Sequence, residues 1–425
     1  MATQDFSGIT DLKRQAVEKD VKKFFENNTP GLSAFKRVVD KPPLTEKGYR
    51  LPNYSQRPGG DTWFTPSQSD FNAAVSMQTT SMWVYPTMYA LPIMWTGSAL
   101  DSMELDTADN VNSLDEIMGL YSDTASKMLN QLFYGDGSGA LAYSASTISS
   151  LGSQTLSGTT AAAATPGQTK GVIRLWQNHV YQAINTSTAT VRGTFTVTTP
   201  GTTSCTINLT SGTISSGDPI VTVGAYQMAM RGLGWLISDQ TRVLQGLSTS
   251  TNPDLNAPVI DLAGALLTPA AISNVKALIK TRNNDQKADR GLTGFITPGQ
   301  IQTILKQGYN LGYYLREDTA SDTMKGVQNA YQDGDTQWVE DADNDEDRVY
   351  LSLTSVMKLY EMMPFGLYNR DKQEWRMLLG ANNSGSDNYQ KAMGWKGNPA
   401  ILSPRATGFI KRAQLPVATQ VSSGL

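Results

Sequence analysis

Cysteine and histidine are almost absent from this sequence of 425 residues, which contains one of each, Cys205 and His179. An internal disulfide is therefore impossible, and so is a zinc site built from several cysteine and histidine ligands. Any Ser-His-Asp or Cys-His catalytic site would depend on His179 alone. His179 lies among apolar residues of the stretch 175–184 at helix-like spacing, which favours a packing role. Cys205 lies in an alternating run, which predicts a strand.

Charge and long apolar runs are also scarce. Charged residues make up 17% of the chain and the formal net charge is -3, with a sequence pI of 5.4 and a mean hydropathy of -0.32. Neutral polar residues must supply much of the surface, as suits a protein that associates with copies of itself. No broad basic surface for nucleic acid is expected. Because neither a membrane-length apolar run nor a signal-peptide core is visible, we expect a soluble protein made in a reducing cytoplasm.

The strongest element of the sequence is a long amphipathic helix over Ser113–Phe133. Ser113 and Glu116 have the spacing of a capping box, and Gly135 is placed to end the helix in the left-handed conformation. At about 1.5 Å per residue the helix would be on the order of 30 Å long. Its apolar positions alternate steps of four and three, which marks one face. These positions are Leu114, Met118, Tyr121, Ala125, Met128 and Leu132.

Three stretches precede this helix. Ile9–Phe25 predicts an amphipathic basic helix, either an arm that docks on a neighbouring subunit or a helix packed on its own domain. Lys41–Gly60 has too many proline and glycine and too few apolar residues to build its own core, so we expect an extended excursion. Met82–Trp95 is densely aromatic and interrupted by two prolines, which predicts extended and mostly buried chain.

The chain after the helix mixes both kinds of secondary structure. Ser144–Gln168 is polar and low in complexity, which predicts a loop, and Thr169–Asn185 predicts a second helix. Arg192–Val223 alternates in three short runs and predicts a small all-β unit, interpreted as an insertion. Helices are then expected at 269–281 and 298–305, a strand and turn at 294–298, and strands at 349–357 and 376–379. The pattern predicts an α+β chain without regular βαβ alternation.

Recognisable chemical motifs are few. No phosphate-binding loop occurs, and the glycine clusters at 135–139 and 232–234 are interpreted as turns. Asp341–Asp347 has the early carboxylate spacing of a calcium loop, but Glu346 occupies the glycine position and Ser352 the position of the bidentate glutamate. We interpret it as an exposed acidic turn. No carboxylate pair can be selected for hydrolysis, so we assign no catalytic, cofactor-binding or metal-binding residue.

The order of these elements resembles the major capsid proteins of tailed bacteriophages, the HK97-like fold. The segments that carry the resemblance are Leu132-Phe-Tyr-Gly-Asp-Gly-Ser-Gly139, Arg231-Gly-Leu-Gly-Trp-Leu-Ile237, Leu244-Gln-Gly-Leu247, Asn252-Pro253, Pro258-Val-Ile-Asp261, Gly294-Phe-Ile-Thr-Pro298 and Arg348-Val-Tyr-Leu351. The β unit with Ser216-Gly-Asp218 resembles the insertion domains of some members.

The resemblance implies an α+β HK97-like capsid fold with an N-terminal arm, an extended loop, a long spine helix, peripheral and axial domains, and a small all-β insertion. The implied boundaries are an arm at 1–40, an extended loop at 41–80, a peripheral domain at 81–185 with the spine helix at 113–133, a β-rich insertion at 186–228, a mainly axial domain at 229–370, and a return to the sheets with a C-terminal tail at 371–425.

The implied function is a non-enzymatic major capsid protein without cofactors. It would assemble into hexamers and pentamers of an icosahedral phage head that encloses double-stranded DNA. The expected partners are copies of itself, a separate scaffolding protein, a portal and, as a further candidate, a decoration protein, with no membrane. Assembly is expected in the host cytoplasm and the final location is the virion. The family's Lys–Asn crosslink cannot be placed on any residue here.

Two other functions stay open. One is a different self-assembling virion component, such as a tail or baseplate protein, although the long excursion before the helix argues against rings or tubes. The other is a polysaccharide-active enzyme that stacks tryptophan and tyrosine on sugars. The missing signal peptide and the unpaired Cys205 argue against that enzyme.

Overall fold

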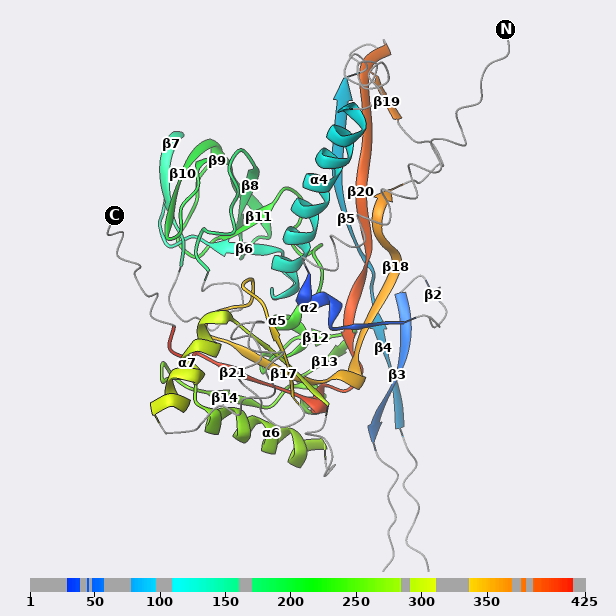
Figure 1. Ribbon diagram of the computed structural model, residues 1–425, viewed down its shortest axis with the longest axis vertical. Coiled ribbons are helices and arrows are strands. Elements are labelled where there is room, and N and C mark those ends of the chain that lie inside the picture. Colours follow the sequence, from blue (N-terminus) through cyan, green and yellow to red (C-terminus); the bar gives the residue numbers. More distant parts are fainter. Residues whose placement is uncertain are drawn as a thin grey trace, which may run out of the picture.

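The computed structural model describes residues 29–38, 44–45, 48–56, 78–96, 109–159, 170–283, 291–310, 336–368, 376–379 and 385–415. The helix predicted at Ile9–Phe25 lies outside them. The described chain forms an elongated sheet with a long helix, a β-barrel, a core sheet with two helices, and a projecting hairpin (Figure 1). None of the described helices is both long enough and apolar enough to cross a membrane.

The long helix α4 spans Asp109–Phe133 and confirms the central prediction. It starts before Ser113, which therefore lies inside the helix and is not its cap. Its end is where the sequence predicts it, but Gly135 closes the last turn through a hydrogen bond from its N–H to Leu132 O of 3.1 Å. The left-handed residue is Gly137, with φ +80°.

An elongated sheet lies along α4 (Figure 1). Its central strand β20 (Gly385–Ile401) pairs antiparallel with β5 (Thr87–Thr96), β18 (Met357–Tyr368) and β19 (Arg376–Leu379), and β1 (Lys36–Arg37) pairs parallel with β18. The face toward the helix contributes Tyr89, Leu91, Phe365, Met393 and Trp395 to the cluster that holds Ala125, Met128 and Leu132. The buried stripe of the helix therefore packs on the sheet.

The stretch predicted to be extended and buried around Met82–Trp95 is extended, as β4 and β5, but it is not mostly buried. Tyr85 is 50% exposed and Met88 46% exposed. Pro92 lies inside β5, which pairs only with β20 among the described strands. A proline is tolerated there because an edge strand leaves one row of its backbone groups unpaired.

Six strands between α4 and residue 223 form a closed barrel. They are β6 (Ala140–Tyr143), β7 (Gly152–Ser157), β8 (Val180–Asn185), β9 (Thr190–Thr199), β10 (Ser204–Gly212) and β11 (Pro219–Thr222), paired in the order β6-β11-β8-β9-β10-β7. A bridge between Ser144 and Gly158 and a 3.0 Å hydrogen bond from Thr159 N to Tyr143 O join the two end strands. Closure leaves no open sheet edge. Alternate side chains fill the interior, among them Leu156, Tyr181, Phe195, Val197, Cys205, Ile207 and Leu209.

The barrel overturns two sequence predictions and enlarges a third. The helix predicted at Thr169–Asn185 is a turn followed by β8, because Tyr181 and Ala183, both fully buried, follow the two-residue period of a strand. The loop predicted at Ser144–Gln168 contains β7. The all-β unit predicted at Arg192–Val223 is only half of the barrel, since β8 and β9 pair across the predicted boundary at residue 186.

The two rare residues of the chain both belong to the barrel region. Cys205 lies on β10, as predicted, and is 3% exposed. His179 precedes β8 and does not lie on a helix. Its ring packs edge-on against Trp176 at 5.4 Å between centroids, and partial burial lowers the pKa of His179. The packing role predicted for this histidine is consistent with that contact.

The core sheet has the order β14-β21-β17-β15-β16, with β14 (Val259–Asp261), β21 (Thr407–Lys411), β17 (Val349–Leu353), β15 (Leu292–Ile296) and β16 (Gln337–Glu340). Helices α6 (Pro269–Asn283) and α7 (Pro298–Asn310) confirm both later helix predictions. The strand predicted at 349–357 divides at a 3-10 turn, η3 (Thr354–Val356), and its last residue starts β18 in the elongated sheet.

Successive side chains of the core strands point to opposite faces of the core sheet, and each face belongs to a different buried cluster. Val349 and Leu351 of β17 pack with α6 and α7, whereas Tyr350 between them packs on the other face. Phe295 of β15 lies on that second face as well, 6.2 Å from Phe133 at the end of α4 between ring centroids. The end of the long helix is therefore built into the core sheet.

The projecting hairpin consists of β3 (Gly48–Gln56) and β4 (Gln78–Val84), with the short β2 (Leu44–Thr45) beside β3. Lys41–Gly60, expected to be an extended excursion without a core of its own, is extended where the structure describes it, as β2 and β3. Tyr49 and Leu51 pack with β4, β18 and β20 in a separate buried cluster. The remaining short elements are α2 (Pro30–Ser33), α5 (Leu233–Leu236), β12 (Val243–Leu244), β13 (Leu247–Ser248), η1 (Pro253–Leu255) and η5 (Pro404–Ala406).

Proline at Ala125, which is fully buried in α4, should destabilise the subunit by about 3 kcal/mol or more. The ring removes a backbone hydrogen bond and clashes with the preceding turn. Ala125→Gly is the control, since it should cost only about 1 kcal/mol in helix propensity. Urea unfolding followed by circular dichroism measures both, and equal losses for the two variants would refute a continuous rigid helix at this position.

Candidate functional site: an acidic junction at the end of the long helix

The acidic segment Asp341–Asp347, predicted to be an exposed turn, is mostly buried, together with Arg348 that follows it. Asp341 is 5% exposed, Asp345 1%, Asp347 0% and Arg348 3%. The prediction failed because the partners that remove these charges from water come from distant parts of the chain. Buried charges persist only when they are paired and hydrogen-bonded, so the partners define what the segment does. We call this segment and its partners the acidic junction.

The end of α4 contributes Asn130, and Tyr134 follows directly after the last residue of the helix, Phe133. Asn130 Nδ2 donates to both carboxylate oxygens of Asp341, at 3.1 and 2.9 Å, and the Tyr134 hydroxyl donates to Asp341 Oδ2 at 3.0 Å. The i, i+4 spacing places both donors on the same face of the helix. Asp341 N in turn donates to Ile296 O of β15 at 3.0 Å. The carboxylate therefore joins the end of α4 to the core sheet.

Burial raises the pKa of Asp341, and the hydrogen bonds from the Asp343 N–H, Asn130 and Tyr134 oppose part of that effect. Burial also raises the pKa of Tyr134, and the nearby Asp341 carboxylate adds to the shift. Both effects keep the tyrosine protonated, so its hydroxyl remains a donor to Asp341.

The barrel side contributes two cations from the turn that precedes β8. Arg174, 2% exposed, donates from Nη2 to the backbone oxygen of Asp343, and the same nitrogen lies 3.7 Å from Asp345 Oδ1. Lys170 Nζ lies 3.0 Å from Glu346 Oε1. These contacts fasten the barrel to the acidic junction.

The core sheet and its helix α7 complete the set. Arg348 Nε lies 3.7 Å from Asp347 Oδ1 and 3.9 Å from Asp345 Oδ2. Gln300 of α7 donates to the backbone oxygen of Glu346, and Ala413 N donates to Asp347 O at 3.0 Å. One short segment therefore contacts the long helix, the barrel, α7 and the chain after β21. Removing one partner of a buried ion pair costs about 3–5 kcal/mol, so the junction holds these parts at fixed angles.

The geometry indicates a mechanical role for the junction. No group of three or more His, Cys, Asp or Glu within the described ranges could hold a metal ion. Asp341 is surrounded by donors from asparagine, tyrosine and a backbone N–H, and Arg174 and Arg348 lie near the deeper carboxylates. The arrangement orients backbone elements.

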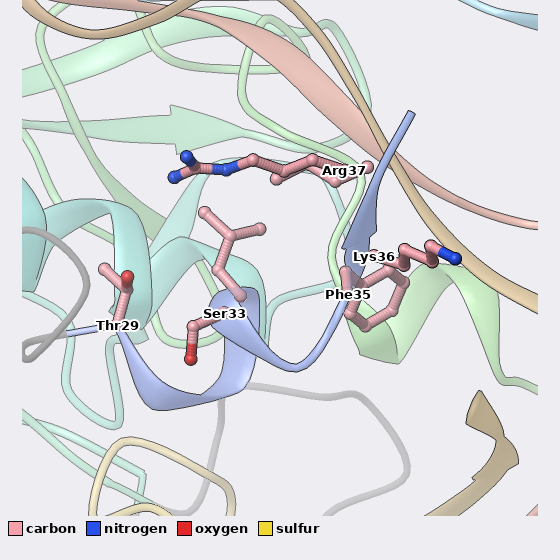
Figure 2. A pocket seen from close by; sticks show the side chains of 7 residues that line it. Thr29, Ser33, Phe35, Lys36 and Arg37 are labelled. Atoms are coloured by element: carbon pink, nitrogen blue, oxygen red, sulfur yellow. The ribbon is translucent and has the colours of Figure 1, made fainter. Parts of the chain in front are cut away.

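A pocket of about 480 Å³ opens between α2 and β1. Thr29, Leu32, Ser33, Phe35, Lys36, Arg37 and Leu359 line it. Arg37 extends from β1 across the space beside α2, whereas Lys36 points the opposite way (Figure 2). Arg37 Nε lies 3.1 Å from Glu361 Oε2, and Glu361 Oε1 accepts a 2.9 Å hydrogen bond from Trp395 Nε1. Arg37 therefore fastens β1 to the elongated sheet.

Sequence reasoning assigned no site residue, and it missed all partners in the junction. The available signal was a pair of polar residues where an apolar helix end was expected. Asn130 and Gln131 follow Leu129 at the buried end of the helix, next to apolar turns. A buried asparagine requires a partner. The excess of carboxylates at 341–347 was the complementary signal, but their separation along the chain hid the pairing.

The fold, but not the sequence, matches known proteins. No protein-family model and no curated protein sequence matches the chain. The capsid asymmetric unit of cyanophage A-1(L) aligns over 91% of this chain and 93% of that chain, with a TM-score of 0.52 and 10% identity. The capsid of an empty GTA particle and a structure from Mycobacterium phage Bobi align with TM-scores of 0.47 and 0.44, at 8% and 9% identity, and cover about 90% of both chains. With identity this low, the first match shows a shared fold, and the α+β chain therefore has the capsid fold that the resemblance implied.

Asp341→Asn should change the pH dependence of subunit stability. A carboxyl whose pKa is raised in the folded state destabilises the fold once it ionises, so its contribution is lost as the pH rises from 3.8 through the raised value. The asparagine variant should lack this component, and its stability relative to wild type should rise across that window. Urea unfolding between pH 3 and pH 7 measures it. Asp254→Asn, at a side chain 57% exposed, is the control, and an unchanged profile for Asp341→Asn would contradict the junction geometry.

Proposed function

We propose that this chain is the major capsid protein of a tailed bacteriophage, which assembles into hexamers and pentamers of an icosahedral head. The observation that carries the proposal is the fold shared with the cyanophage A-1(L) capsid over nearly the full length of both chains. Fold alone does not decide function. The shape of the molecule adds support, because an elongated sheet and a projecting hairpin extend beyond the compact core (Figure 1).

The proposed mechanism is mechanical. Helix α4 and the elongated sheet form a rigid wedge, because Met128, Leu129 and Leu132 of the helix are buried in one apolar cluster with residues of the sheet. The acidic junction sets the angle between this wedge, the barrel and the core sheet. The hairpin β3–β4 engages a neighbouring subunit and adapts to hexamer and pentamer surroundings. Several weak contacts of this kind become strong together through effective concentration.

The domain assignments follow the same proposal. The elongated sheet with α4 corresponds to the peripheral domain, the core sheet with α6 and α7 to the axial domain, and the hairpin to the base of the extended loop. The barrel corresponds to the insertion, with its start moved back to β6. The arm expected at 1–40 is described from residue 29 to residue 38, as α2 and β1, and residues 1–28 and 416–425 lie outside the described residues.

The proposed partners are further copies of the chain, a separate scaffolding protein, a portal and a decoration protein. The shell would enclose double-stranded DNA without reading its sequence, since the formal net charge of -3 favours packing and release over tight binding. Assembly in the host cytoplasm and residence in the virion follow from this function. A structural, non-enzymatic role is part of the proposal.

Electron microscopy of the purified chain, expressed alone and with candidate scaffolding proteins, tests this function. Closed shells of uniform diameter are the expected result. Rings or tubes would instead favour a tail or baseplate component, the first alternative. Release of reducing sugar from polysaccharides by a soluble monomer would favour the enzyme alternative and overturn the capsid proposal.

Shortening the hairpin should separate folding from assembly. Replacing residues 57–77 with a four-residue Gly-Ser turn keeps Tyr49, Leu51, Met82 and Val84, which anchor the base of the hairpin. We expect the thermal midpoint of the subunit to stay within a few degrees of wild type while closed shells are lost. Sedimentation velocity measures the assembly. Normal shells from the shortened chain would remove the hairpin from the proposed mechanism.

A further inference from the structure

Arg242 is a buried cation surrounded by neutral oxygens. Its side chain is 7% exposed, and Asp239, the acidic residue whose charge acts on it, has its carboxylate paired with Lys411. Nη1 donates to Ser238 O at 2.9 Å, Gln240 O at 3.1 Å and Asn256 Oδ1 at 3.2 Å, and Nη2 donates to Leu236 O at 3.2 Å. Burial lowers the pKa of Arg242 to about 10, against an opposing effect of the nearby Asp239 carboxylate, so Arg242 stays charged at neutral pH. A guanidinium in this setting holds the segment 236–256 around itself.

The bonds around Arg242 set the base of the small hairpin β12–β13. Arg242 N donates to Thr249 Oγ1 at 2.9 Å, and Thr249 N donates to Arg242 O at 2.9 Å. The tip is Gln245-Gly246, with φ +50° and +87°. Positive φ at both central positions is the requirement of the tight two-residue hairpin turn. The guanidinium and the turn therefore fix where this tip points.

The tip of β12–β13 contacts the base of the projecting hairpin. Trp83 N of β4 donates to Gln245 O at 2.7 Å. A Cβ at Gly246 would lie 3.1 Å from Trp83 Cδ1, so only glycine allows this approach without displacement. Leu247 packs against the cluster of Tyr49, Leu51, Met82 and Val84. The β12–β13 tip therefore holds the end of β4 in place. The backbone oxygen of Gln245 accepts its hydrogen bond, Gly246 leaves room for the Trp83 ring, and Leu247 packs against the hairpin cluster.

We propose that Arg242 is a positioning residue for assembly: it shapes the β12–β13 tip that receives Trp83, and thereby sets the direction in which the hairpin β3–β4 leaves the subunit. This inference rests on the proposed function, in which the hairpin engages a neighbouring copy. According to this inference, Arg242 controls the direction of the hairpin although it does not belong to the hairpin.

Hydrogen exchange on the full-length Arg242→Lys chain tests the inference. Lysine keeps the positive charge but cannot supply the fork of donors that reaches four oxygens. Amides of 236–256 and of 78–84 should exchange on the order of tenfold faster or more, while the barrel strands 140–222 stay at wild-type rates. Arg282→Lys is the matched control, because among the described residues the Arg282 guanidinium donates to one backbone oxygen, Pro253 O at 2.9 Å, and both segments should stay protected.

Two outcomes would overturn the inference. Faster exchange confined to 236–256, with β4 at the wild-type rate, would make Arg242 a local structural residue. Uniformly faster exchange over all described elements would make it a general stability residue. Gly246→Ala gives an independent reading, because it displaces Trp83 and strains the turn at a positive φ without touching Arg242. It should accelerate exchange in the turn 243–248 and in 78–84, while the rest of 236–256 stays at the wild-type rate.

Assembly is measured separately. If the wild-type chain forms shells, Arg242→Lys should form fewer closed shells or shells of altered diameter, whereas Arg282→Lys should match wild type. Normal shells from Arg242→Lys would overturn the inference. If the wild-type chain forms no shells, the proposed function fails, and the exchange of 78–84 still decides whether Arg242 positions the hairpin.

Discussion

The structure depends on the need to pair buried charge. Asp341, Asp345 and Asp347 lie together with Arg174 and Arg348 at depths where an isolated charge would cost several kcal/mol. No single secondary structure element supplies all the hydrogen-bond donors and cations that these carboxylates need. Asn130 comes from the long helix, Arg174 from the turn before β8, and Arg348 from the position just before β17. The acidic junction therefore forms only when the long helix, the barrel turn and the core sheet are all in place. The buried charges therefore make these three local structures depend on one another. Apolar packing alone does not do this, because it is non-directional.

Apolar packing supplies the complementary part of the architecture. A strand exposes alternate side chains to opposite faces, and β17 uses this to join the cluster beneath α6 and α7 to the cluster around the end of α4. The core sheet is thus a shared wall between two layers. The hairpin, by contrast, is anchored at its base by a small cluster with β18 and β20 and by the β12–β13 tip. The centre is therefore held by larger buried clusters than the hairpin.

Local patterns predicted the local structures. The end of α4, the helices α6 and α7, and the strands β15 and β19 are encoded within windows of a few residues, and the sequence contains all that is needed to place them. The stretch around β8 was predicted to be a helix because its apolar residues fit both the 3.6-residue period of a helix and the two-residue period of a strand. Burial of Tyr181 and Ala183 inside the barrel favours the strand. The acidic junction could not be derived at all, since Asn130 and Asp341 are 211 positions apart and Arg174 and Asp343 are 169 apart. A carboxylate-rich turn looks the same in sequence whether water or a distant arginine solvates it.

The anchoring of α4 is uneven along its length, and this follows from close approach at one end. A Cβ at Gly31 would overlap the Tyr134 hydroxyl, and a Cβ at Gly232 would overlap the carbonyl oxygen of Phe133. Two backbone segments therefore press against the helix end at distances that only glycine allows. Toward the other end, Leu120 is 61% exposed. The close contacts at Gly31 and Gly232 therefore fix the end of α4 where it meets the acidic junction, and this fixed end sets the direction of the helix relative to the core sheet.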